Sequence, residues 1–104
     1  MTTFDDREQA FENKFVHDEE VQFRAEARRN KLVGLWAAAL IGKAGAEAEA
    51  YAADCVAEDI KEHGEEDVFR KLSTDLGALA DERTIRAKMA ELMTVARHQV
   101  MTDR

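Results

Sequence analysis

The chain has 104 residues, of which 45% are hydrophobic and none is proline, and its formal net charge at pH 7 is −7. A chain of this length builds one small core, which excludes a deep cleft between two domains. The acidic balance, with a pI near 4.9, disfavours nucleic acid as a partner because phosphate backbones attract basic surfaces.

Residues 1–19 are predicted to form an N-terminal arm outside the core. Phe4, Phe11 and Phe15 are spaced by seven and four residues, so a helix would align them in a narrow aromatic stripe. The surrounding residues are mostly polar, and residues 1–20 carry seven acidic and two basic side chains. We therefore expect the arm to be mobile when free and to become helical in a partner groove. The alternative is that these residues are the opening turns of a long first helix whose three phenylalanines cap one end of the bundle.

Residues 20–104 are predicted to form an all-α four-helix bundle. Alanine, glutamate, lysine, arginine and leucine dominate the sequence and favour helices. Breaks are expected at Gly42–Gly45, at His63–Gly64, and at Ala80–Asp81 after Gly77 weakens a helix end, with Asp81 as an acceptor at the next helix start. Short connections make consecutive helices antiparallel neighbours.

Each predicted helix carries one apolar stripe at spacings of three and four residues, typical of a helix with one buried face. The second predicted helix, residues 46–62, is rich in alanine, which permits close approach of its neighbours. In chain order, the positions expected to face the core are Leu32, Leu35 or Trp36, Ala39 and Leu40; Ala48, Tyr51 or Ala52, Cys55, Val56 and Ile60; Val68 or Phe69, Leu72, Leu76 and Leu79; and Ile85, Met89, Leu92, Ala96 and Val100.

Charge alternates in blocks along the chain. Residues 21–46 carry five basic and one acidic side chain, whereas residues 47–67 carry nine acidic and one basic. Such blocks suit antiparallel helices with complementary rims, so Arg28, Arg29 and Lys31 are expected to face the acidic second helix. The simpler interpretation, a set of solvated faces, is favoured because exposed pairs stabilise a fold by only about 0.5 kcal/mol.

The sequence offers no catalytic or metal-binding motif, so we predict a protein that is not an enzyme and needs no cofactor. Gly42-Lys43 lacks the earlier glycine and the following serine or threonine of a phosphate loop. The histidines beside acidic clusters, His17 and His63, do not have the spacing of metal ligands. Ser73 has no adjacent histidine to activate it, and the single cysteine, Cys55, cannot form an internal disulfide.

A small-ligand site is the main alternative to a protein-binding function. Trp36 and Tyr51 could stack on a nucleotide base between helices, with Arg28, Arg29 or Lys43 near its phosphates. An aromatic pair in a bundle is more often part of the core, and we favour that interpretation.

A series of short runs, spread over nearly the whole chain, is similar in number, order and spacing to a known family. These runs are Thr2–Glu8, Phe11-Glu12, Lys14-Phe15, His17-Asp18, Ala27–Leu32, Gly34, Trp36–Ala38, Gly42, Gly45, Tyr51-Ala52, Glu66–Lys71 and Ile85–Lys88. On these runs the chain resembles the zeta subunit, the small inhibitor protein of alphaproteobacterial F-type ATP synthases.

The resemblance implies a four-helix bundle preceded by an inhibitory N-terminal region that enters a catalytic interface between the alpha and beta subunits and blocks ATP hydrolysis. The phenylalanines of the arm would be the anchors, and its charged residues would contact the alpha, beta or gamma subunits. The partner-binding residues expected on this basis are Phe4, Arg7, Glu8, Phe11, Glu12, Lys14 and Phe15. The resemblance also implies weak nucleotide binding, without positions that name its residues.

The predicted location follows from the same resemblance. No apolar run approaches the roughly 20 residues needed to span a bilayer, and the N-terminus lacks a signal peptide. We therefore expect a cytoplasmic protein that is peripheral to the inner membrane through the ATP synthase.

His17 adds the hypothesis that acidification tunes binding, because a protonated imidazole offsets part of the arm's negative charge. The competing function is a stand-alone bundle that senses a nucleotide or another small ligand.

Overall fold

The computed structural model describes the backbone of residues 3–62 and 65–102, and the side chains of residues 19–58 and 65–102. Helix α1 spans Thr3–Ile41, α2 spans Gly45–Glu62, α3 spans Glu65–Leu76, a 3-10 turn η1 spans Gly77–Leu79, and α4 spans Glu82–Thr102. The described backbone contains no strand. The prediction of an all-α chain with four helices is confirmed.

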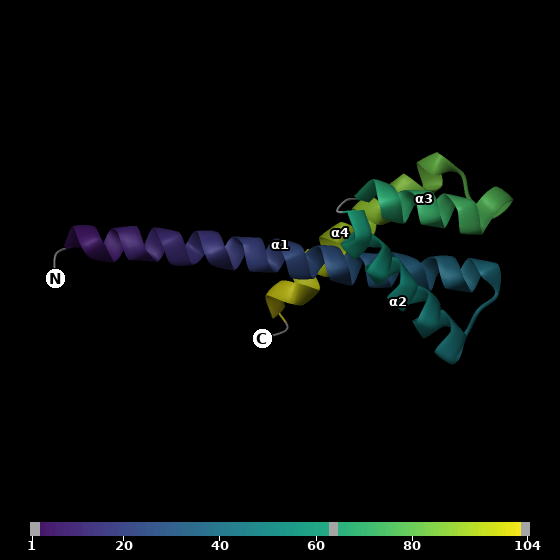
Figure 1. Cartoon of the computed structure of the whole chain (residues 1–104), viewed down its shortest axis with the longest axis horizontal. Helices are drawn as coiled ribbons and strands as arrows, with labels where there is room; N and C mark the ends of the chain where they lie inside the picture. Colours follow the sequence, from purple (N-terminus) through teal and green to yellow (C-terminus); the bar gives the residue numbers. More distant parts are fainter. Residues whose placement is uncertain (1–2, 63–64, 103–104) are drawn as a thin grey trace.

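Helix α1 determines the shape of the molecule. Its 39 residues would measure about 58 Å at 1.5 Å per residue, and the longest dimension of the chain is 61 Å. Helices α2, α3 and α4 gather around the C-terminal half of α1, whereas its N-terminal half extends past them (Figure 1). The radius of gyration, 17.1 Å, exceeds the roughly 13 Å of a compact domain of this size.

The predicted boundary between arm and bundle falls inside α1. The helix continues through residues 19 and 20 without a break, so the open alternative of a long first helix describes the backbone. The division into an arm of residues 1–19 and a bundle of residues 20–104 remains a prediction, because the side chains of residues 1–18 lie outside the described residues.

Local signals place the helix ends where the sequence predicts them. Gly42, Gly45 and Gly77 have φ values of 93°, 56° and 54°, which side chains rarely adopt. At the start of α4, the backbone N–H of Thr84 donates to Asp81 Oδ1 over 2.8 Å. This hydrogen bond, chiefly, lowers the pKa of Asp81 and confirms it as the acceptor that caps the helix.

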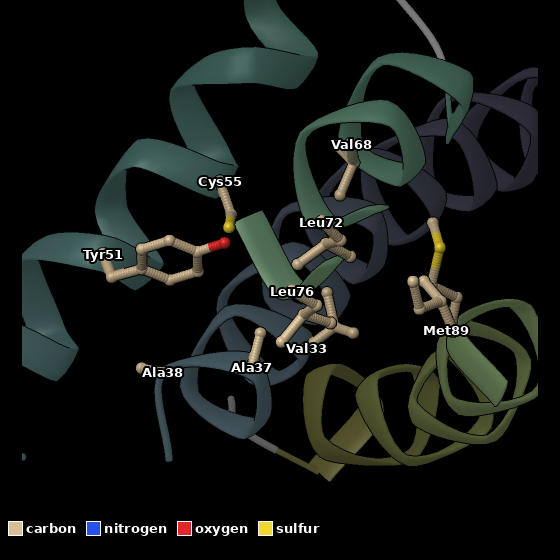
Figure 2. Close-up of a cluster of buried hydrophobic side chains, with 10 residues drawn as sticks. Val33, Ala37, Ala38, Tyr51, Cys55, Val68, Leu72, Leu76 and Met89 are labelled. Atoms are coloured by element: carbon tan, nitrogen blue, oxygen red, sulfur yellow. The ribbon is translucent and has the colours of Figure 1, made fainter. Parts of the chain in front are cut away.

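The core lies between the C-terminal half of α1 and the other three helices. Figure 2 shows Tyr51 and Cys55 of α2 pointing toward Leu72 and Leu76 of α3, beside Val33 of α1. The apolar stripes predicted for α2, α3 and α4 are largely confirmed by the buried residues Tyr51, Ala52, Cys55, Val68, Leu72, Leu76, Ile85, Met89, Ala96 and Val100. The side chain of Ile60, also predicted to face the core, lies outside the described residues.

The predicted buried face of α1 is wrong at Ala39 and Leu40, whereas Trp36 packs against the core as predicted. Ala39 is exposed and Leu40 is 41% exposed, while Val33, Ala37 and Ala38 are buried. The reason is close helix packing: a Cβ added at Gly34 would lie 2.8 Å from the Cα of Ala52 on α2. Small residues therefore line the contact, and the larger leucines lie at its edges.

Leu79 is a second correction in the core. The sequence predicts that it continues the stripe of the third helix, but it is 58% exposed. Gly77, with its positive φ, ends α3 after Leu76 and turns the next residues into η1. The periodicity of the helix therefore no longer applies at Leu79.

Candidate partner-binding site

All seven predicted partner-binding residues lie on the N-terminal half of α1. Phe4, Arg7, Glu8, Phe11, Glu12, Lys14 and Phe15 fall within the helix that begins at Thr3. Their side chains are outside the described residues, as is that of His17. The structure therefore gives their place on the helix, and their contacts remain predictions.

The helical register relates these positions to the core. A step of seven residues returns to almost the same face of a helix. Phe11 precedes the buried Ala25 by fourteen residues, and Phe15 precedes the buried Arg29 by the same interval. The aromatic positions thus continue the buried face of α1 into a region where no other described helix lies beside it (Figure 1).

Polar contacts hold α1 where it leaves the bundle. Arg28 Nη1 donates to Gln99 Oε1 of α4 over 3.1 Å, and Arg97 Nη2 donates to Gln22 Oε1 over 3.3 Å. These bonds join α1 to α4 beside an open groove of about 520 Å³. The groove is lined by Gln22, Glu26, Arg29, Glu65, Met89, Ala90, Met93, Thr94 and Arg97.

Arg29 is buried at this junction, with 4% of its surface exposed. Its Nε donates to Asn30 Oδ1 over 3.0 Å, and its Nη1 lies 4.0 Å from Glu65 Oε1. Glu65 begins α3, so the ion pair of Arg29 goes to the third helix. The less favoured interpretation placed it against the second helix, and the favoured interpretation of solvated faces does not hold for this buried side chain. The Nδ2 of Asn30 is buried without a hydrogen-bond partner among the described residues.

Phe23 is a surface feature that the sequence reasoning missed. It is 70% exposed and borders a shallow groove of about 340 Å³ between α1, α2 and α4. We call this the basic groove; it is lined by Phe23, Arg24, Ala27, Arg28, Lys31, Val56 and Val100. The available sequence signal was the fourth phenylalanine of α1, eight residues after Phe15.

Trp36 and Tyr51, proposed above as a nucleotide-stacking pair, are engaged in the core. Tyr51 is 8% exposed, and its hydroxyl donates to Asp75 Oδ2 over 2.8 Å. Lys71 Nζ lies 4.9 Å from the centre of the Tyr51 ring, and burial chiefly raises the pKa of the tyrosine hydroxyl. Trp36 packs against the core, and Lys88 Nζ lies 5.8 Å from the centre of its ring. The favoured interpretation of both rings as core residues is confirmed.

Two other kinds of site can be assessed in the described part of the chain: a reactive cysteine and a metal centre. Cys55 is buried, and burial chiefly raises the pKa of its thiol to about 11, which keeps it protonated and unreactive near neutral pH. Among the residues described, no group of three or more histidine, cysteine, aspartate or glutamate side chains could hold a metal ion. None of the described helices is both long and apolar enough to cross a membrane.

The fold and the site together define a class of protein. It is a small all-α bundle whose first helix extends beyond the other three at its N-terminal end, where the sequence is acidic and contains three phenylalanines. The model of one family, ATPase inhibitor subunit zeta, matches residues 1–99. The chain therefore belongs to the ATPase inhibitor subunit zeta family.

One solved structure extends the comparison to three dimensions. A structure determined in solution by NMR is 53% identical in sequence and superposes with a TM-score of 0.73. The match covers 80% of this chain and 98% of the other. No curated protein matches the chain.

Proposed function

We propose that the protein inhibits ATP hydrolysis by the F-type ATP synthase and is not itself an enzyme. The observation that supports this most directly is the extension of α1 beyond the bundle (Figure 1), in a chain of the ATPase inhibitor zeta family. A projecting helix can enter a groove of a large partner while the bundle stays outside it. The protein would then act at the cytoplasmic side of the inner membrane, attached to it only through the synthase.

We place the inhibitory contact at a catalytic interface between the alpha and beta subunits, with residues 1–19 as the inserted segment. In this mechanism Phe4, Phe11 and Phe15 fill apolar pockets, because aromatic anchors supply much of the energy of an interface. The charged residues Arg7, Glu8, Glu12 and Lys14 contact the alpha, beta or gamma subunits. The inserted helix acts as a steric wedge that stops rotation in the direction of hydrolysis.

The energetics require the arm to bind strongly. If the free arm is only partly helical, ordering it costs about 2–5 kcal/mol. Burial of one phenylalanine side chain supplies about 1.5–3 kcal/mol, so three such anchors supply about 4.5–9 kcal/mol, which matches or exceeds the ordering cost. The helical backbone that residues 3–19 share with the rest of α1 reduces that cost further, because the bundle provides the helix nucleus.

A hydrolysis assay with the synthase catalytic sector of the source organism tests the proposal. The full chain should inhibit ATP hydrolysis, and a chain of residues 20–104 should not, although it keeps the bundle core. Added peptide 1–19 should inhibit weakly, since it lacks the helix nucleus. Failure of the full chain to inhibit would contradict the proposed function, and inhibition by residues 20–104 would contradict the role of the arm.

A further inference from the structure

The basic groove is unusual on a protein with a net charge of −7. Arg24 and Lys31 are exposed and, within the described residues, form no ion pair; Arg28 between them donates to Gln99. Beside these cations lie the side chains of Phe23, Val56 and Val100, of which Phe23 is 70% exposed. A groove with this lining fits an acidic helix that also carries apolar side chains.

The N-terminal arm of this chain has the complementary spacing. The cations at positions 24, 28 and 31 are separated by four and then three residues, and the carboxylates Asp5, Glu8 and Glu12 by three and then four. Two antiparallel helices with mirrored spacing bring all three pairs into register: Asp5 with Lys31, Glu8 with Arg28, and Glu12 with Arg24. Positions 4, 11 and 15, which are phenylalanines, lie on the neighbouring stripe of the same helix.

We propose that residues 4–15 fold back as a helix, antiparallel to residues 21–32, and dock in the basic groove of their own bundle. In this closed state the arm is held away from the synthase, so docking regulates the inhibitor. The regulatory consequence rests on the function proposed above, whereas the docking itself does not.

The position of the turn favours the chain's own arm over a second copy. The three predicted pairs are placed symmetrically about Asp18, which is followed by Glu19 and Glu20. In an antiparallel pair of chains Asp18 would face its equivalent, with Glu19 and Glu20 of both chains close by, and these carboxylates would repel. In a folded-back chain they form a loop, residues 16–20, whose length is typical of helical hairpins. A short loop also gives an effective concentration in the millimolar range.

The straight form of α1 is not a strong obstacle to folding back. No other described helix lies beside its N-terminal half (Figure 1), and Glu19 and Glu20 are exposed. A helical segment that is not packed against a core opens at low cost. The core of α1 lies further along, at Val33, Ala37 and Ala38, and is unaffected by an earlier turn.

Energy transfer within the full chain distinguishes the two states. Trp36 is the only tryptophan and serves as the donor, and a dansyl group attached to Thr3→Cys serves as the acceptor. In the straight helix these positions are about 50 Å apart, whereas in the closed state residue 3 lies opposite residue 33, at about 10 Å between helix axes. The buried Cys55 reacts slowly, and the chain without Thr3→Cys, treated with the same reagent, controls for its labelling.

Charge reversal tests the predicted pairs. The change Arg24→Glu with Lys31→Glu should abolish the transfer, and adding Asp5→Lys with Glu12→Arg should restore it. The matched control, Lys43→Glu with Arg83→Glu, alters the net charge equally at sites outside the groove and should keep the transfer. High salt should reduce the transfer of the unchanged chain because it screens the ion pairs.

Two results would overturn the proposal: absence of transfer in the unchanged chain at low salt, or transfer that increases with protein concentration, which would indicate a second copy as the occupant. Hydrolysis assays separate docking from function. If the arm is docked nine-tenths of the time, the charge-reversed chain should bind the synthase about tenfold more tightly than the unchanged chain. Transfer without any inhibition by either chain would contradict the proposed function and leave the docking supported.

Discussion

Gly34 lets α1 and α2 cross at close range. A Cβ at this position would lie 2.8 Å from the Cα of Ala52 and 3.2 Å from the Sγ of Cys55. The first of these neighbours is backbone, so the overlap is relieved only if a whole helix moves. Glycine here is required by the neighbouring helix, since within an isolated helix alanine would be the more stable choice.

We expect Gly34→Ala to destabilise the bundle by about 1–2 kcal/mol. Overpacking costs about 1–3 kcal/mol, and the better helix propensity of alanine returns at most about 1 kcal/mol. Urea unfolding would measure the difference. Ala39→Leu, at an exposed position of the same helix, should change stability by no more than about 0.5 kcal/mol. A neutral or stabilising Gly34→Ala would show that α2 can move away.

Asp75 joins α3 to α2 through charge and hydrogen bonding. Its Oδ2 accepts from Tyr51 over 2.8 Å and from Lys71 over 3.0 Å. Partial burial by itself would raise the pKa of Asp75, but the bonds from Tyr51 and Lys71 outweigh it and hold the pKa below the ordinary value of 3.8. The ionised carboxylate therefore stabilises the folded state above that value, and this contribution is lost as the pH falls through the lowered pKa.

Asp75→Asn should consequently be less stable than the unchanged chain at neutral pH, with a difference that shrinks in strong acid. Asparagine can still accept from Tyr51 but carries no charge for Lys71. Thermal unfolding between pH 7 and the acid limit of the fold would measure the effect, with Asp54→Asn as a control at an exposed carboxylate on α2. Parallel pH profiles for Asp75→Asn and the unchanged chain would contradict it.

At the scale of the element, the two halves of the continuous helix α1 have different surroundings. Its C-terminal half is buried through Val33, Ala37 and Ala38, whereas its N-terminal half extends past the bundle (Figure 1). The same register that buries Ala25 and Arg29 carries forward to Phe11 and Phe15. If the arm binds a partner as proposed, these positions are the ones expected to face it.

Replacing Phe11 and Phe15 together by alanine should weaken inhibition by at least about a hundredfold, because two anchors that each contribute about 1.5–3 kcal/mol are removed. Alanine keeps the helix propensity of α1, so the melting temperature should hardly change. Gln9→Ala in the same segment is the control for a general effect on the arm. If the free energy of unfolding falls by as much as the free energy of binding to the synthase, both rings belong to the core instead.

At the scale of the whole molecule, stability and inhibition are predicted to reside in different parts. The core cluster begins at Val33 and includes Tyr51, Cys55, Leu72 and Met89. All of these residues follow the arm in sequence. The arm can therefore change without loss of the bundle.

A chain of residues 20–104 should unfold cooperatively within about 4 °C of the full chain, since a change of 1 kcal/mol shifts the melting temperature of a domain of this size by about 4–8 °C. Calorimetry on both chains measures this. A much lower melting temperature would mean that residues 1–19 stabilise the bundle, and the proposed division of the chain would then be wrong.

The sequence by itself determines the helical class and nearly every helix end, because these depend on local physics. Glycine takes up positive φ at Gly42, Gly45 and Gly77, and Asp81 accepts the Thr84 N–H, whatever the rest of the chain does. The buried faces of α3 and α4 can also be predicted from the sequence, since large apolar residues such as Leu72 and Ile85 mark them. The family resemblance carried by the residue runs is confirmed by the match over residues 1–99.

Only the tertiary structure decides which face of α1 is buried and where a surface groove forms. The close crossing at Gly34 selects small residues for the contact, so the larger Leu40 is left 41% exposed against the hydrophobic pattern. The basic groove needs Lys31 of α1, Val56 of α2 and Val100 of α4 to meet. These residues are far apart in sequence, and no local pattern can predict that packing brings them together.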